Sequence, residues 1–232
     1  MACNGNFTLE THHSNGFLHS SIIRLGAVLA VLLAPVTASA QDWEVNRDML
    51  LAARRGDDAA VLKLLGEGAS VNSRNRLGDT ALNIAAKNGK TDLALQLIER
   101  GADVNLSNLS GVSPLMSASF NGDVAVAKAL LARGADVTKA DRVKKTAAVY
   151  AAANGHSEVL SLLFDSGVDV NTPHDNDLTL LMWAAAYGRA DTVRFLLARG
   201  AKPEARDNRG QTAREMAIAG GHLATAQLLQ PR

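Results

Sequence analysis

Leucine recurs at one fixed interval along most of this chain. The interval is 33 residues, and another apolar residue stands three positions before each leucine. The two columns are Leu64, Leu97, Leu130, Leu163, Leu196 and Leu229, and Val61, Ala94, Ala127, Leu160, Val193 and Ala226. Because residues three apart lie on one face of a helix, each pair predicts the buried face of a short helix. A face repeated at a fixed interval predicts a stack of similar repeats with one continuous core.

Hydroxyl residues and glycines mark a further helix in each repeat. A Thr or Ser opens the repeat, at Thr80, Ser113, Thr146, Thr179 and Thr212. Glycine then recurs in two columns, at Gly56, Gly89, Gly122, Gly155, Gly188 and Gly221, and at Gly68, Gly101, Gly134, Gly167 and Gly200. A hydroxyl accepts hydrogen bonds from the free N–H groups of a first helical turn, and glycine adopts the positive φ that ends a helix. The pattern therefore predicts two helices in each repeat, followed by a projecting polar turn.

Composition and charge narrow the class of protein. Aromatic residues make up only 4% of the chain, which suits small helices packed closely together. The formal net charge is +1, which gives no electrostatic footprint for nucleic acid. We therefore expect no nucleic-acid partner.

The first 40 residues have the pattern of a secretory leader. Arg24 precedes the apolar run 25–36, and Ala38, Ser39 and Ala40 form a small-residue cleavage motif. The run is too short to span a bilayer comfortably, although a membrane anchor and a buried helix are the alternatives. We expect a signal peptide at residues 1–40, cleaved after Ala40, and no stable membrane insertion of the mature chain 41–232. The mature chain is then periplasmic or secreted.

Two stretches carry a specific resemblance. Residues 80–89 read Thr-Ala-Leu-Asn-Ile-Ala-Ala-Lys-Asn-Gly, and residues 101–105 read Gly-Ala-Asp-Val-Asn. This resembles the ankyrin repeat, and the likeness extends over the whole mature chain. It implies an all-α fold with short β-hairpin fingers, an α-solenoid of about six helix-pair repeats. The expected repeats are about 43–75, 76–108, 109–141, 142–174, 175–207 and 208–232.

The chain departs from the family pattern at two positions of the repeat. The family histidine of the opening motif is replaced by Asn83, Met116, Val149, Met182 and Glu215, which is expected to weaken the polar lattice between repeats. The finger glycine present at Gly78, Gly111 and Gly210 becomes Lys144 and Asp177. We expect the fourth and fifth fingers to differ in shape from the rest.

No constellation of residues predicts catalysis. The mature histidines are His156, His174 and His222, and none has the i, i+4 spacing of a helical zinc pair. We expect no enzyme activity, metal or cofactor, a structural role for His156 and His222, and burial of Trp183 between helices. A small-ligand or enzymatic role at Lys87, His174 or Asp175 is an alternative.

The resemblance implies that contacts with a partner are made by the ends of the first helices and by the fingers. The expected residues at the helix ends are Arg55, Lys87, Asn88, Phe120, Asn121, Asn154 and Tyr187. Those on the fingers are Arg76, Leu77, Asp79, Leu109, Val112, Arg142, Val143, Lys145, Asp175 and Leu178. Exposed apolar residues rimmed by charge are typical of interaction surfaces.

The expected partner is another protein. The chain resembles bacterial periplasmic ankyrin proteins, which points to a periplasmic enzyme as the partner of a monomeric binding module. The alternative is a secreted effector or neutralising protein that acts on a target outside the cell.

Overall fold

The structure is a computed structural model that describes residues 42–230. The expected signal peptide and its cleavage site therefore lie outside the described residues. The chain divides into two parts, Met1–Glu44 and Val45–Arg232, and the second part contains nearly all of the described residues. None of the described helices is long and apolar enough to cross a membrane.

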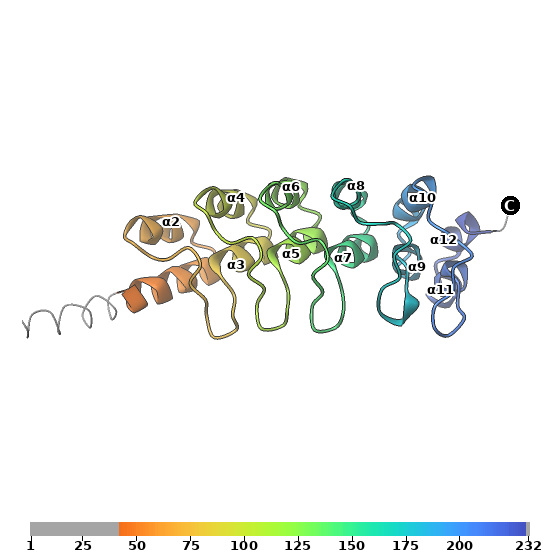
Figure 1. Cartoon of the computed structure of the whole chain (residues 1–232), viewed down its shortest axis with the longest axis horizontal. Helices are drawn as coiled ribbons and strands as arrows, with labels where there is room; N and C mark the ends of the chain where they lie inside the picture. The colour runs from red at the N-terminus through yellow and green to blue at the C-terminus, as the bar shows by residue number, and fades with distance from the viewer. Residues whose placement is uncertain (1–41, 231–232) are drawn as a thin grey trace, which may run out of the picture. The chain divides into compact units, whose positions relative to one another are not determined.

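The helices of the second part form two rows. Residues 45–55 are helical. The outer row consists of α2 (Asp58–Gly66), α4 (Thr91–Glu99), α6 (Val124–Ala132), α8 (Ser157–Asp165), α10 (Ala190–Ala198) and α12 (Leu223–Leu228). The inner row continues from residues 45–55 with α3 (Ala81–Lys87), α5 (Pro114–Asn121), α7 (Ala147–Asn154), α9 (Leu180–Ala186) and α11 (Ala213–Ala219). From α3 onward each helix packs against the next member of its own row and against its pair mate in the other row. Figure 1 shows this stack of helix pairs, with loops projecting toward one edge.

The leucine column forms the spine of the core, as the sequence pattern predicts. Leu97, Leu130, Leu163 and Leu196 are all completely buried. Leu64, in the first pair, is only half-buried because fewer neighbours cover it. The buried apolar residues join into one continuous cluster along the stack, since each helix pair covers the apolar face of the next.

The predicted caps are also found where the sequence places them. The N-cap residues of the inner row from α3 to α11 are the five predicted hydroxyl residues, and each side chain accepts a hydrogen bond from the third helical N–H. Oδ1 of Asn83 accepts a bond from the N–H of Thr80. Nδ2 of Asn83 donates to the carbonyl of Leu106 in the following loop, at 2.9 Å. Met116 and Met182 only accept a bond from their own caps, through sulfur. Asn83 thus retains a cross-link that a thioether does not provide.

The residue that directly follows each glycine of the first column can bond to the preceding repeat, as His156 and Arg189 do. Nε2 of His156 lies 3.0 Å from the carbonyl oxygen of Phe120, and Nε of Arg189 donates to the carbonyl oxygen of Ala153 at 2.9 Å. The imidazole of His156 lies directly over Gly122, where a Cβ would come within 2.6 Å of its Cε1. This contact confirms the structural role expected for His156 and shows why a residue without a side chain stands opposite it.

The projecting loops are turns, and the described residues contain no strands. We call residues 75–79, 108–112, 141–145, 174–178 and 207–211 the edge loops. In each, the N–H of the first residue donates to the carbonyl of the fifth, and the N–H of the fourth donates to the carbonyl of the first. Isolated antiparallel bridges join Ala140 to Thr146 and Arg206 to Thr212. The β-hairpin fingers implied by the family resemblance are therefore not formed as strands here.

The two edge loops that lack the usual glycine behave differently. Lys144 has a φ of 62°, close to the 76° and 80° of Gly78 and Gly111, so loop 141–145 keeps the common turn and the expected change of shape is wrong there. In loop 174–178, the stretch Asp175–Asp177 forms a short 3-10 turn (η1) in which Asn176 and Asp177 both have a φ of 60°. Only this loop departs from the others.

Lys144→Gly is expected to raise the free energy of unfolding by about 0.5–1 kcal/mol. The left-handed conformation costs an L-residue about 1–2 kcal/mol, and the greater freedom of glycine in the unfolded chain offsets about 0.5–1 kcal/mol of the relief. Urea unfolding measures the change. The matched control is Val143→Gly, at an exposed neighbour without a positive φ, which is expected to be destabilising. If Lys144→Gly destabilised the protein, the positive φ of Lys144 would not be a source of strain.

Candidate protein-binding surface

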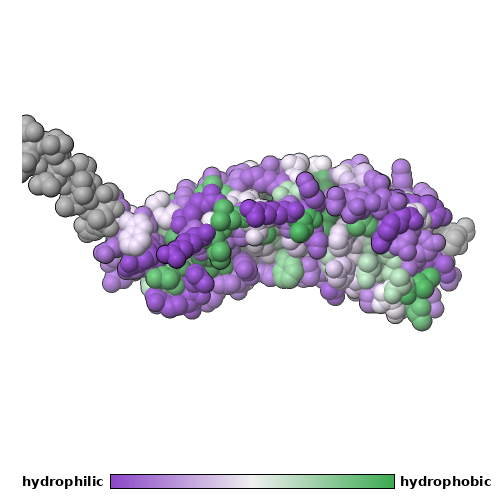
Figure 2. Space-filling view, turned by 90° about the horizontal axis from the view of Figure 1, so that it is seen from below, coloured by the Kyte–Doolittle hydropathy of each residue, from purple (hydrophilic) through white to green (hydrophobic). Residues whose placement is uncertain are grey.

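The predicted contact residues lie at the C-terminal ends of the inner-row helices and on the edge loops. Lys87 and Asn121 are the last residues of α3 and α5, and Tyr187 is the C-cap of α9. The ten predicted finger residues fall in edge loops 75–79, 108–112, 141–145 and 174–178. Figure 2, which views the molecule from the side toward which the loops project, shows apolar patches interrupting a mainly hydrophilic face. We call these helix ends and loops the binding surface.

The apolar members of the binding surface are exposed. Nine large hydrophobic side chains are exposed among the described residues, and five of them were predicted contacts. These five are Leu77 (60%), Leu109 (56%), Phe120 (53%), Val143 (66%) and Tyr187 (49%). Val112 and Leu178 are half-buried. Since large apolar side chains are otherwise mostly buried, their concentration here marks a surface suited to a partner.

Three polar residues predicted as contacts are engaged within the protein. The carboxylate of Asp79 accepts a bond from Asn108 Nδ2 at 2.9 Å, which joins two edge loops. Asn121 donates from Nδ2 to the carbonyl of Ala86, at 2.9 Å, in the preceding repeat. Asn154 donates to a carbonyl of its own helix. The bonds of Asp79 and Asn121 thus join neighbouring repeats, whereas that of Asn154 stays within α7.

An aromatic row crosses the inner helices at the middle of the binding surface. We define it as Phe120, Tyr150, Trp183 and Tyr187, together with the Lys145 side chain. The rings of Phe120 and Tyr150 meet edge to face at 6.0 Å, and those of Trp183 and Tyr187 stack at 6.2 Å. Lys145 Nζ lies 4.9 Å from the Trp183 ring centre and 5.8 Å from that of Tyr150, within the range of cation–π attraction. The ammonium thereby bridges the two aromatic pairs.

A buried carboxylate fixes the row to its loop. The hydroxyl of Tyr150 donates to Oδ2 of Asp141 at 2.6 Å, while Oδ1 of Asp141 accepts the backbone N–H groups of Val143 and Lys145. Burial, and then the bond and charge of Asp141, raise the pKa of Tyr150, so the phenol stays protonated. One aspartate thus positions an aromatic ring and the backbone that carries Lys145.

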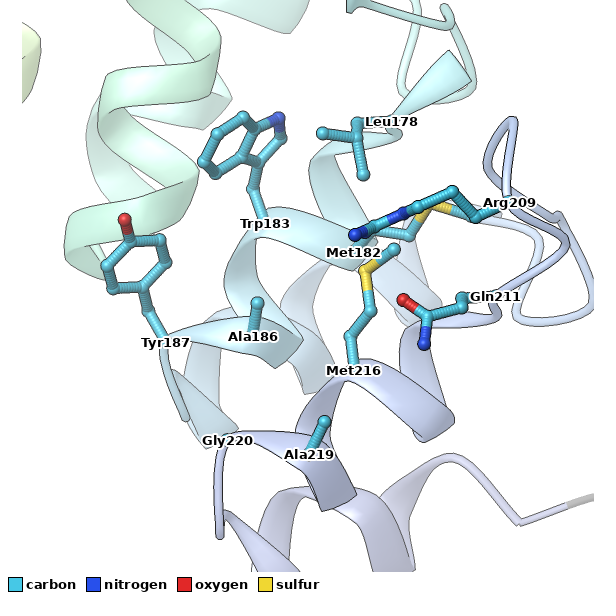
Figure 3. A pocket seen from close by; sticks show the side chains of 10 residues that line it. All are labelled: Leu178, Met182, Trp183, Ala186, Tyr187, Arg209, Gln211, Met216, Ala219 and Gly220. Atoms are coloured by element: carbon cyan, nitrogen blue, oxygen red, sulfur yellow. The ribbon is translucent and has the colours of Figure 1, made fainter. Parts of the chain in front are cut away.

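A cavity of about 430 Å³ opens beside the row, between α9, α11 and edge loop 207–211. Figure 3 shows Trp183 and Tyr187 on one side of it, and Met216 and Arg209 on the other. Arg209 is held by an ion pair with Asp207, which is 5% exposed, at 3.0 Å. Aromatic, thioether and guanidinium groups together suit an apolar side chain with a polar end.

Sequence reasoning missed part of this surface. Trp183 is half-buried and lines the cavity, so the expectation of burial between helices is only partly correct. Tyr150, Met216 and Arg209 were not predicted as contacts. The signal was present in one column, which reads Ile84, Ser117, Tyr150, Trp183 and Met216 and becomes large in its last three members.

Stacked helix pairs with a shared core and a row of projecting loops define a helical-repeat protein. A family model described as ankyrin repeats (three copies) matches residues 49–141 and 148–232. The match covers well over half of the chain, so the chain belongs to the ankyrin-repeat family. No curated protein matches it. Ankyrin repeats are generally protein–protein interaction modules and are typically non-enzymatic. Among the described residues, no group of three or more His, Cys, Asp or Glu is placed to hold a metal ion.

Proposed function

We propose that this protein is a non-enzymatic binding module that holds another protein against its aromatic row and edge loops. The observation that carries the proposal is the exposure of Phe120 and Tyr187 at the two ends of the aromatic row. Rigid aromatic side chains supply a large contact area, and they are enriched at the energetic centres of interfaces.

The charges around the row indicate the character of the partner. Among the predicted contacts on the binding surface, the exposed basic residues Arg55, Arg76, Lys87 and Arg142 outnumber the two carboxylates, Asp79 and Asp175. Complementary charge guides association and disfavours wrong partners. The partner surface is therefore acidic around an apolar centre.

The place of action in this proposal is the periplasm. Its support is the sequence of the first 40 residues, where Arg24, an apolar run and the Ala38–Ala40 motif follow the order of a secretory leader. A monomer that acts on a periplasmic enzyme fits this location.

Simultaneous Phe120→Ala, Arg142→Ala and Tyr187→Ala substitution is expected to weaken partner binding about 100-fold or more, since truncation of an aromatic or arginine anchor costs about 2 kcal/mol or more at a well-packed interface. The partner is first recovered by cross-linking in an osmotic-shock extract, and its affinity for both forms is then measured with purified components.

The control is a Lys128→Ala, Leu223→Ala variant on the outer row, where both side chains are exposed. It is expected to bind like the unchanged protein. Circular dichroism verifies that both variants fold. If the triple variant bound the partner as tightly as the unchanged protein, the partner would have to bind another face.

A further inference from the structure

One edge loop lacks the side chain that organises the others. The first residue is Asn75, Asn108, Asp141 or Asp207 in four loops, and its side-chain oxygen accepts the N–H groups two and four residues later. In loop 174–178 this residue is His174, for which no such bond is formed, and its Nε2 is buried without a hydrogen-bond partner. Since buried polar atoms are normally paired, this nitrogen needs an explanation.

The same loop is separated from its neighbour on one side. Other adjacent edge loops are linked by a backbone bond, from Leu109 N–H to Leu77 O at 2.9 Å, and from Arg142 N–H to Ser110 O at 3.0 Å. Loop 207–211 is linked to loop 174–178 in the same way. Within the described part of the chain, no backbone bond joins loops 141–145 and 174–178. A cavity of about 140 Å³ lies between them, which is room for more than a single water molecule.

A second buried polar atom without a partner belongs to this cavity. Trp183 lines it, and Nε1 of Trp183 is buried without an acceptor. Figure 3 shows this nitrogen on the edge of the indole that is turned toward Leu178, which also lines the cavity. The indole N–H can only donate. Any group that pairs with it must therefore be an acceptor.

The backbone around the cavity is strained. The three non-glycine residues with positive φ among the described residues are Lys144, Asn176 and Asp177, and all three belong to these two loops. The other edge loops use glycine at the equivalent turn position. Such conformations persist where the surroundings fix them, and they concentrate at functional sites. Lys144 and Asn176 both line the cavity.

The lining selects for one class of ligand. Lys144 and Lys145 supply two positive charges against the single negative charge of Asp175, and the lining contains no arginine. Burial lowers the pKa of His174, so its imidazole is neutral at pH 7 and donates from one nitrogen. Val143, Val149 and Leu178 add apolar walls. The groups fit an anionic acceptor on an apolar stem, as in a carboxylate carried by a carbon chain, whereas inorganic phosphate offers the apolar walls nothing to contact.

We call the cavity between edge loops 141–145 and 174–178 the notch. We propose that the notch binds a carboxylate, with Trp183 Nε1–H and the Lys144 and Lys145 ammonium groups as donors. As part of the protein-binding function proposed above, this carboxylate is an acidic side chain or the C-terminal carboxylate of the partner. Its binding pairs the indole N–H and brings an anion to the two lysines.

The test is a titration of the purified, ¹⁵N-labelled protein with sodium acetate, with sodium chloride keeping the ionic strength constant. The two tryptophans give two indole N–H signals, and Trp43, which is 62% exposed and does not line the notch, is the internal control. We expect the Trp183 signal to move downfield along a saturable curve while that of Trp43 stays in place. An unmoved Trp183 signal, or the same movement with phosphate, overturns the proposal. Because no partner is present, such a failure leaves the function of the aromatic row untouched.

Three capped peptides then identify the source of the carboxylate. Acetyl-Gly-Glu-Gly-amide carries it on a side chain, acetyl-Gly-Gly-Gly carries it at the C-terminus, and acetyl-Gly-Gln-Gly-amide is the neutral control. At least one charged peptide is expected to bind about tenfold more tightly than the control, and the tighter of the two names the source. Equal affinities for all three overturn the proposal.

Two substitutions separate binding from structure. Trp183→Phe keeps a ring beneath Lys145 but removes the donor, and it is expected to weaken acetate binding about fivefold, read from the backbone amide of Asn176. The matched control is the same substitution at the other tryptophan, Trp43→Phe, which lies outside the notch and is expected to leave acetate binding unchanged. Asp175→Asn, at an exposed position, removes the opposing charge and is expected to tighten binding severalfold. Unchanged affinity in Trp183→Phe and Asp175→Asn alike refutes the assignment.

Discussion

Leu163→Ala is expected to lower the free energy of unfolding by about 3–5 kcal/mol, the range for a fully buried leucine that leaves a cavity. Leu163 has no exposed surface and lies in α8, which packs against α6 and α10 on its two sides and against α7 below. The walls of the cavity belong to three neighbouring helices of one stack, so they cannot collapse independently. Urea unfolding followed by circular dichroism measures the change.

Leu64→Ala is the matched comparison, because it stands at the equivalent position of the first helix pair and is only half-buried. Its expected cost is about 1–2 kcal/mol, since less apolar surface returns to water. A similar loss of unfolding free energy in both variants would show that burial along the leucine column does not set the cost of the substitution.

Gly122→Ala is expected to cost about 2–3 kcal/mol. Gly122 ends α5 with a φ of 72°, where an L-residue loses about 1–2 kcal/mol. A Cβ would also lie 2.6 Å from Cε1 of His156, which is held by its contact with the carbonyl oxygen of Phe120. Moving the imidazole sacrifices that bond, worth about 1 kcal/mol. Thermal and urea unfolding report the sum.

Gly134→Ala separates the two causes. Gly134 has a φ of 79°, but a Cβ there would meet nothing within 4 Å, so only the backbone cost of about 1–2 kcal/mol is expected. Adding His156→Ala to Gly122→Ala should cost less than the sum of the two single changes, because the steric conflict disappears. Strict additivity would show that the imidazole does not oppose the new methyl group.

The helical framework was predictable because it rests on local signals that repeat. Thr80 begins α3 as its N-cap, and Leu97 is fully buried at its place in the column. From residue 76 onward, each repeat carries the cap residue, the helix and the buried leucine at the same positions, so every one of these repeats supports the same prediction. The β-hairpins were carried over from the family resemblance, and the backbone of the loops forms turns instead.

The candidate surface was predictable only in its exposed apolar residues. Leu77 and Phe120 are large apolar residues outside the buried columns, and both side chains are exposed. Asn121 was counted among the contacts, but its amide reaches the carbonyl of Ala86 in the preceding repeat. Residue type does not distinguish an asparagine that faces a partner from one that pairs with the adjacent helix, because both are short and polar.

The notch depends on how two loops are placed relative to each other, and the 33-residue sequence period does not predict that placement. Its one readable sign is the column Asn75, Asn108, Asp141, His174 and Asp207, in which a single imidazole interrupts a run of side-chain oxygens. That exception becomes meaningful once the hydrogen bonds of the other four residues are known.

The missing backbone bond between loops 141–145 and 174–178 has a mechanical consequence. On the helical side of this junction, Arg189 reaches the carbonyl of Ala153 and Arg199 reaches the hydroxyl of Ser161. A bending movement can therefore pivot on those arginines and widen the loop edge without rupturing any main-chain link. The same opening between loops 75–79 and 108–112 would break the bond from Leu109 N–H to Leu77 O.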